Sequence, residues 1–441
     1  MRDKLYLLAI LILFALILFM GKNKLAAFYY NRAGGYYERH LYKEAIDSFN
    51  KSLKINPSVA VAHYGLGDAY FQEGLKDKAV EEYKKAIQLD ANFVPAYTDL
   101  ADAYIRQKLY QEAVNTLKKA KAAFPSDREI KDLMDYVSFE YTAYLLGTGV
   151  DAFIAGDKVK AYGLLETALK INPDFIFSHY ILGYFYYADQ QYDQAITALN
   201  AARRLDNNLF LIHKLLGDVY FAKGFFENAV DEYRMALAIN KNDAALLNNL
   251  GLAYMNLEKY DEAVSFLRKA LNLEPGKVNF RYALASVYRD QGRLGEAVLE
   301  YEKVISAESG YSNVHNDLGD IYKQQGRARE ALDEYRKEIA LCRHKLSLNP
   351  NNSLVLNNLA YAYNGTGEYA KAKEFIDKAL AINPAYRKAY LTLADIQKNL
   401  GNTGEALIAL EKAKTLSGRE QLFIDEAIRD LNGLRPFIKR K

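Results

Sequence analysis

Apolar residues recur at helical spacing along almost the whole chain, in short blocks separated by turns. In residues 244–277 this spacing is interrupted once, between Leu257 and Asp261, which predicts two short helices joined by a turn. Gly251 and Ala263 fall where the two helices would cross, because close approach of two backbones leaves no room for larger side chains. Pro275 then ends the second helix.

The same 34-residue unit recurs eleven times after residue 25. Position 20 of the unit is Ala in all eleven copies, and position 11 is Tyr in nine, the exceptions being Ala152 and Gln397. The order Leu-Gly-x-x-Tyr, then the alanines, then a closing proline resembles the tetratricopeptide repeat (TPR). The resemblance implies an all-α, right-handed superhelical solenoid of helix-turn-helix units. The repeats start at residues 26, 60, 94, 142, 176, 210, 244, 278, 312, 353 and 387.

Two insertions interrupt the 34-residue period. The first follows repeat three, where Ser126 and Glu129 form a capping-box signature. We expect an extra helix there or a long extension of the next one, and any hinge in the array belongs at this point. The second lies within Glu338–Asn349 of repeat nine and equals about two helical turns, so it should lengthen that helix by ~10 Å.

An uncharged apolar run precedes the repeats. It extends from Leu5 to Met20 and spans about 24 Å as a helix, short of the roughly 30 Å hydrocarbon core but within reach if flanking lysines snorkel. The alternative is a cleaved signal peptide. Lys22 and Lys24 follow the run directly, however, and the one small-residue site, 26–27, lies inside the first repeat, so we expect an uncleaved helix.

This helix would anchor the chain in a membrane, which we take to be a bacterial inner membrane crossed once. Basic residues flank both ends of the run, so the sequence leaves open the side on which the repeats lie. The predicted parts are the anchor at 5–21, repeats 1–3 at 26–127, a helical insert at 128–141, repeats 4–11 at 142–420, and a C-terminal capping helix with a basic tail at 421–441.

Composition and motifs argue against nucleic-acid binding, cysteine-based sites and catalysis. The 58 basic and 55 acidic residues leave a net charge of only +3, which disfavours nucleic-acid binding. Cys342 is the single cysteine, which excludes an intramolecular disulfide and a cysteine-rich metal site. No nucleophile elbow, phosphate-binding glycine loop or metalloprotease motif is present, and only 21 residues follow repeat eleven. We therefore predict neither an enzyme nor a cofactor.

Four of the six histidines share position 4 of their repeats. They belong to different repeats, mostly too far apart to share one metal ion, so we expect them to pack between helices. These are His63, His179, His213 and His315.

The first helix of each TPR unit is expected to line the concave groove, and its groove positions change character along the chain. In repeats four to six they are apolar or aromatic with few charges, which indicates a bound partner on an otherwise wet surface. The alternative is that some of them face a neighbouring helix. The residues are Phe153, Phe177, Tyr180, Tyr184, Tyr187, Leu211 and Phe221.

In repeats seven to ten the same positions turn polar. They resemble the asparagine ladder with which the O-linked N-acetylglucosamine transferases hold an extended peptide, although Ala283 interrupts it. The residues are Asn248, Asn249, Asn316, Asp317, Asn357 and Asn358. Lys214 and Asn249 also fit the clamp with which chaperone-binding TPR proteins hold a C-terminal carboxylate, but Asp218 would repel that group. Aspartates at position 9 should make the groove acidic, namely Asp68, Asp102, Asp218, Asp320 and Asp395.

Together these patterns predict a membrane-anchored TPR scaffold that binds a segment of a partner protein or peptide in its concave groove. Two other functions stay open: a structural subunit of an envelope secretion or polysaccharide-export assembly, and the binding subunit of a split enzyme. The fold alone does not choose among them, because a repeat array carries partner identity in a few groove residues. The oligomeric state is likewise undetermined.

Overall fold

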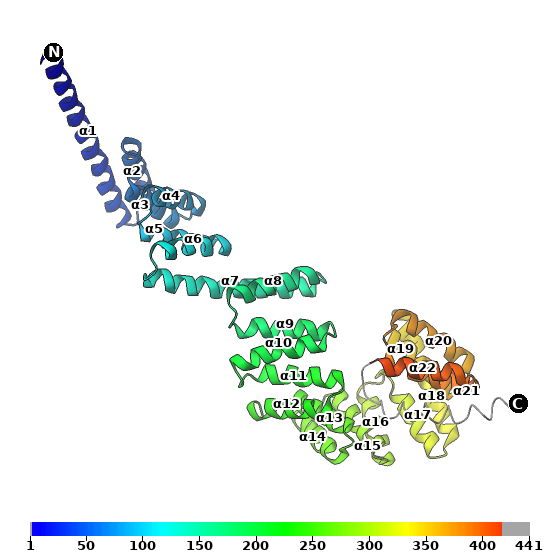
Figure 1. Ribbon diagram of the computed structural model, residues 1–441. Helices are drawn as coiled ribbons and strands as arrows, with labels where there is room; N and C mark the ends of the chain where they lie inside the picture. The colour runs from blue at the N-terminus through cyan, green and yellow to red at the C-terminus, as the bar shows by residue number, and fades with distance from the viewer. Residues whose placement is uncertain (1, 417–441) are drawn as a thin grey trace. The chain divides into compact units, whose positions relative to one another are not determined.

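The computed structural model describes the backbone of residues 2–416 and the side chains of residues 20–416. The described backbone forms 22 α-helices and no strand (Figure 1). The predicted capping helix and tail, 421–441, lie outside the described residues, and so do the side chains of the predicted anchor, 5–21, except for its last two residues. Among the residues with described side chains, no helix has the length and apolar character needed to cross a membrane.

The chain divides into two compact units, residues 1–178 and 179–441. Helices of the first unit pair in sequence order, and α9 crosses the division. They are α1 (Arg2–Tyr37), α2 (Tyr42–Ile55), α3 (Ala60–Gln72), α4 (Lys76–Leu89), α5 (Val94–Arg106), α6 (Tyr110–Ala123), α7 (Arg128–Ile154), α8 (Lys158–Ile171) and α9 (Ile176–Ala188).

The second unit continues the same alternation of a first and a second helix in each repeat. Its further helices are α10 (Tyr192–Leu205), α11 (Phe210–Lys223), α12 (Phe226–Ile239), α13 (Ala244–Asn256), α14 (Tyr260–Leu273), α15 (Val278–Asp290), α16 (Leu294–Ala307), α17 (Val314–Gln324), α18 (Ala328–Leu348), α19 (Ser353–Gly365), α20 (Tyr369–Ile382), α21 (Arg387–Asn399) and α22 (Thr403–Thr415).

These helices make eleven pairs, as the repeat pattern predicted. Eight first helices begin at the predicted repeat start, among them α3 at Ala60 and α13 at Ala244. Small residues lie at the crossing within a pair: Ala263 is fully buried, and a Cβ on Gly251 would lie 2.7 Å from Cγ of Leu267. That separation is shorter than real carbon–carbon contacts, so the pair packs this closely only with glycine at the crossing.

The turn inside each repeat has one fixed conformation. Its fifteenth residue has a positive φ in all eleven repeats, and it is glycine in seven of them. The other four are His40, Lys108, Gln190 and Glu258, with φ between 58° and 60°. A left-handed residue at this point ends the first helix and reverses the chain, so the turn geometry is common to every repeat.

The two insertions lengthen existing helices. Residues 128–141 form the N-terminal half of α7, which is 27 residues long. Its N-cap is Asp127, whose carboxylate accepts a hydrogen bond from the backbone N–H of Ile130 at 3.0 Å, rather than the expected Ser126. The surplus in repeat nine extends α18 to 21 residues.

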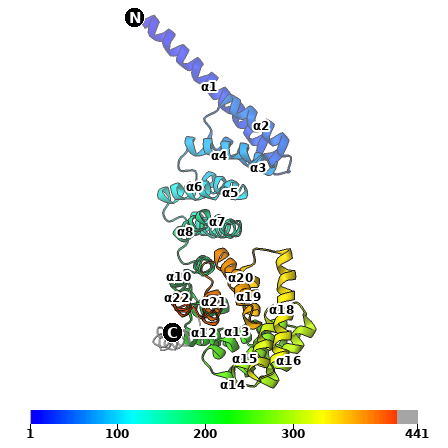
Figure 2. The same ribbon diagram turned by 90° about the vertical axis from the view of Figure 1, so that its right-hand side faces the viewer.

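First helices lie on the inner side of the stack. In the second unit α13 contacts α15, α17 contacts α19, and α19 contacts α21. Neighbouring repeats come closest on the inner side of a curved stack, so these helices line its concave side. In the first unit, the N-terminal part of α1 projects beyond α2 (Figure 2).

Candidate partner-binding surface

The predicted aromatic groove residues keep much of their surface open to solvent. Phe177, in the first unit, is 45% exposed, and Phe153 of the same unit is half-buried. In the second unit Tyr184 is 48% exposed, while Tyr180 and Tyr187 are half-buried. These three tyrosines follow one another at helical spacing on α9, so they share a face of that helix.

Tyr180 and Tyr187 lie close enough to α11 for the charge of Asp218 to affect them. Burial raises the pKa of Tyr180 and of Tyr187, and the negative charge of Asp218 raises both further. The structure therefore brings α9 tyrosines and the predicted groove aspartate together, although they belong to different repeats.

Asp218 is the centre of a chain of hydrogen bonds. Its Oδ1 accepts from Oη of Tyr233 at 2.7 Å and from Nδ2 of Asn249 at 3.1 Å. Nδ2 of Asn248 donates in turn to Oδ1 of Asn249 at 3.3 Å. Burial raises the pKa of Asp218, while the Tyr233 bond and the charge of Lys214 oppose that shift. We call Tyr180, Tyr187, Asp218, Tyr233 and Asn249 the Asp218 cluster.

Asp317 is fully engaged inside the array. It accepts hydrogen bonds from Tyr282 at 2.7 Å, Arg289 at 2.5 Å and Asn313 at 3.2 Å, and it is only 5% exposed. Its charge is therefore compensated by Arg289 and is not offered to a partner in the groove.

The asparagines of repeats nine and ten are buried as well. Asn316, Asn357 and Asn358 are 1%, 1% and 2% exposed. Nδ2 of Asn316 donates to the backbone oxygen of Asn358 at 3.1 Å, and Nδ2 of Asn357 lies 3.4 Å from Oδ1 of Asn358. These amides join α17 to α19, which differs from the expected ladder in an open groove, because here the two first helices lie close enough for side chain and backbone to pair directly.

A second set of paired residues was not anticipated from the sequence. Where position 24 of a repeat is tyrosine, its hydroxyl bonds to the side chain at position 9, fifteen residues earlier. The pairs are Tyr83 with Asp68 at 2.8 Å, Tyr233 with Asp218 at 2.7 Å, Tyr301 with Ser286 at 3.0 Å and Tyr335 with Asp320 at 2.6 Å. These pairs could have been predicted from the sequence, because tyrosine at position 24 occurs together with aspartate or serine at position 9. Three of the groove aspartates are thus hydrogen-bonded inside their own repeats, and burial raises the pKa of each.

Three of the position-4 histidines pack between helices, as expected. Each faces a glutamate nineteen residues later in the same repeat. The pairs are His63 with Glu82 at 2.6 Å, His213 with Glu232 at 2.7 Å and His315 with Glu334 at 2.6 Å. His63 and His213 also reach backbone oxygens through Nε2, at 2.9 and 2.8 Å. Both nitrogens of these two rings are therefore used in packing.

Comparison with known proteins supports the repeat assignment. Models described as "TPR repeat" match residues 35–74, 183–224 and 217–258. Models described as "Tetratricopeptide repeat" match residues 60–93, 77–135, 244–277, 278–311, 310–385 and 388–419.

Several solved structures match part or most of the chain. Yeast Tom70 is 15% identical, with 94% of this chain and 97% of that chain covered and a TM-score of 0.46. The TPR domain of P58(IPK) is 18% identical, with coverage of 86% and 99% and a TM-score of 0.30. MamA is 25% identical, with coverage of 36% and 94% and a TM-score of 0.35. No curated protein sequence matches the chain. Since the repeat models together match most of the described helices, the chain belongs to the tetratricopeptide repeat family.

Proposed function

We propose that the protein is a non-catalytic scaffold whose concave face in repeats five to seven binds a segment of a partner protein. The observation that supports this most directly is Tyr184, a large aromatic side chain that is 48% exposed on α9, the first helix of repeat five. Tyr180 and Tyr187 extend the same face, so the apolar surface is continuous along the helix. Such surface on a repeat array is typical of a protein-binding site.

The polar groups of the Asp218 cluster lie beside this apolar face and would orient a bound segment. Aromatic side chains contribute contact area with little loss of conformational freedom, and the neighbouring polar groups fix the orientation of what binds. Lys214 and Asn249 have side-chain N–H donors near the groove, whereas Asp218 is half-buried and already accepts hydrogen bonds from Tyr233 and Asn249. The expected ligand is an extended or helical segment with apolar side chains, held against α9 and α11.

Affinity for a partner captured on the full-length chain tests this proposal. Buried aromatic anchors cost about 2 kcal/mol or more on truncation, so Tyr180→Ala with Tyr184→Ala should weaken capture at least ~tenfold. Leu299→Ala is the matched control, because Leu299 is 57% exposed on the second helix α16. Circular dichroism should show both variants folded. Unchanged affinity in the tyrosine variant would place the binding surface elsewhere and favour contacts on the convex side.

We also propose that residues 5–21 anchor the protein in a membrane. The run from Leu5 to Met20 has no charged residue, and the backbone of α1 continues without a turn into the first repeat. The full-length protein should therefore stay in the membrane fraction after carbonate extraction, and Leu8→Lys with Ile12→Lys should release it. A mature N-terminus near Phe28, found by mass spectrometry, would contradict this and indicate a cleaved signal peptide.

A further inference from the structure

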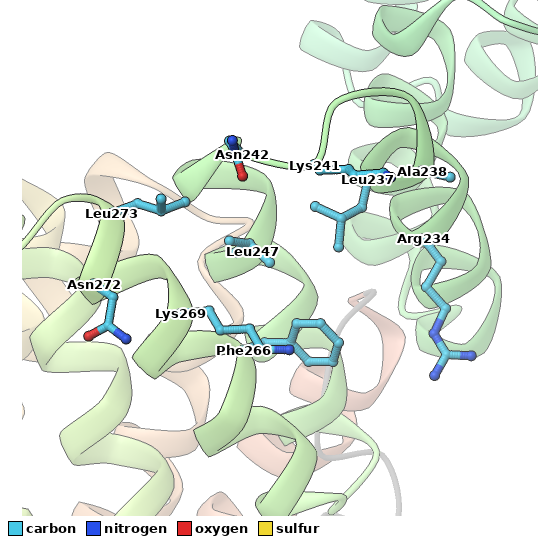
Figure 3. A pocket seen from close by; sticks show the side chains of 10 residues that line it. All are labelled: Arg234, Leu237, Ala238, Lys241, Asn242, Leu247, Phe266, Lys269, Asn272 and Leu273. Atoms are coloured by element: carbon cyan, nitrogen blue, oxygen red, sulfur yellow. The ribbon is translucent and has the colours of Figure 1, made fainter.

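A groove of about 550 Å³ lies between α12, α13 and α14, on the side of the second helices (Figure 3). Leu237, Leu247, Phe266 and Leu273 give it an apolar floor. Its other lining residues are Arg234, Ala238, Lys241, Asn242, Lys269 and Asn272, so the lining has three cationic side chains and no carboxylate.

At this groove, repeat seven departs from a pattern that other repeats share. In repeats two and nine the position-4 histidine pairs with a glutamate at position 23, and a lysine at position 26 pairs with the same glutamate. The lysine contacts are Lys85 with Glu82 at 2.7 Å and Lys337 with Glu334 at 2.6 Å. In repeat seven the histidine and glutamate positions hold Leu247 and Phe266. Lys269 therefore loses its carboxylate, and its Nζ lies 5.0 Å from the centre of the Phe266 ring.

The three cations are not neutralised within the described part of the chain. No ion pair among residues 20–416 involves Arg234, Lys241 or Lys269. Arg234 instead lies over the ring of Tyr254 at 5.6 Å, and that ring stacks on Phe266 with centroids 5.5 Å apart. The stacked rings hold Arg234 and Lys269 beside the apolar floor, so positive charge and apolar surface occur together.

Two related sites differ in charge from this groove, whose cations belong to repeats six and seven. The corresponding groove between α4, α5 and α6 includes Glu112 in its lining. Repeat ten has the same Leu356, Phe375 and lysine pattern, but there Glu374 pairs with Lys378 at 2.6 Å. The residue of repeat seven that corresponds to Glu374 is Ser265, which is exposed.

We propose that the groove binds an acidic peptide segment of a partner protein, in which an apolar side chain is flanked by carboxylates. The apolar side chain would enter between Leu237 and Phe266, which face the same space in Figure 3, and the carboxylates would pair with Arg234, Lys241 and Lys269. The amides of Asn242 and Asn272 can both donate to and accept from a peptide backbone. This is a second binding surface, separate from the concave face of repeats five to seven.

The probe is the fluorescent, capped peptide Glu-Asp-Leu-Phe-Glu-Asp, titrated with the full-length protein. Capping removes the terminal carboxylate, so binding reports on the side chains. Binding should weaken as salt rises, and it should be lost when lysines replace the four acids or when serines replace Leu-Phe. Binding that survives either replacement would overturn the proposal.

Ser265→Glu is the sharpest variant, because it gives Lys269 the same i,i+4 partner that Glu374 gives Lys378, without changing the groove floor. Ser265→Glu should lower the affinity for the peptide severalfold, and Lys269→Glu should lower it about tenfold or more. Lys119→Glu, in the groove between α4 and α6, makes the same change in net charge and should leave affinity nearly unchanged. Equal losses in Lys119→Glu and Lys269→Glu would mean a general charge effect and would overturn the proposal.

Two further measurements distinguish this groove from the concave site and from a lipid-binding surface. The Tyr180→Ala, Tyr184→Ala variant should bind the peptide like the wild type, so failure of the concave site and failure of this one are distinguishable. Vesicles of phosphatidylglycerol should not compete with the peptide at the groove. Vesicle binding that depends on Lys269 while the peptide fails to bind would assign the surface to lipid and refute a peptide ligand.

Discussion

At the scale of single residues, three aspartates of the first helices are hydrogen-bonded to tyrosines of the second helices. Asp68, Asp218 and Asp320 each accept a hydrogen bond from the tyrosine fifteen residues later in the same repeat. A phenol held at 2.6 to 2.8 Å replaces the water that an exposed carboxylate would bind. Burial raises the pKa of all three carboxyl groups, so ionisation costs more here than on an open surface.

Asp68 gives this effect a measurable pH dependence. Burial is the main reason that the pKa of Asp68 rises from 3.8 to about 7. The negative charge of Asp99 adds to this rise, while the hydrogen bond from Tyr83 opposes it. Because the folded pKa exceeds the unfolded one, the contribution of Asp68 to stability is fully present below about pH 4 and is lost as the pH rises through about 7. Asp68→Asn cannot ionise and should remove this loss.

This prediction can be checked by measuring amide hydrogen exchange in α3 and α4 at pH 5 and pH 8. The rates are corrected for the intrinsic exchange rate at each pH. The wild type should lose protection at pH 8 relative to pH 5, and Asp68→Asn should lose less. Glu81→Gln, at an exposed site on α4, should behave like the wild type. An identical pH response in Asp68→Asn and the wild type would show that Asp68 does not control it.

At the scale of helices, the repeat period predicted most of the fold, because the spacing of small and apolar residues repeats with every turn-linked pair. It placed α13 and α14 and anticipated the longer α18. It did not identify Asp127 as the cap of α7, since Ser126 and Asp127 are both good capping residues and only the backbone path decides between them. Choices of this kind depend on one or two dihedral angles.

Of the candidate sites, too, some features could be predicted from the sequence and others could not. The exposed face of α9 could be predicted, because it needs only helical spacing and the resemblance to known arrays. The burial of Asn357 and Asn358 could not, because it depends on how closely α17 approaches α19. The presence of Leu247 and Phe266 could be seen in the sequence, but the groove that they line depends on the separation of α12 and α14.

At the scale of the whole molecule, each helix pair is stabilised by its neighbours. One continuous apolar cluster of buried residues runs from Ala229 in α12 to Ile321 in α17. In such an array, stability is close to a sum of repeat and interface contributions. Damage to one crossing should therefore spread only to adjoining repeats.

Overpacking one crossing tests this locality. A side chain on Gly251 would meet Leu267 Cγ at 2.7 Å and the backbone oxygen of Ala263 at 3.3 Å, so Gly251→Leu forces α13 and α14 apart. Ala263→Leu acts at the same crossing, and each change should cost about 1–3 kcal/mol. Ala245→Leu is the control, because Ala245 is exposed on the same helix α13. Hydrogen exchange should show protection lost from α11 to α16 and retained from α3 to α6. Uniform loosening of both regions would mean that the array unfolds as one cooperative unit, and the nearest-neighbour description would not hold.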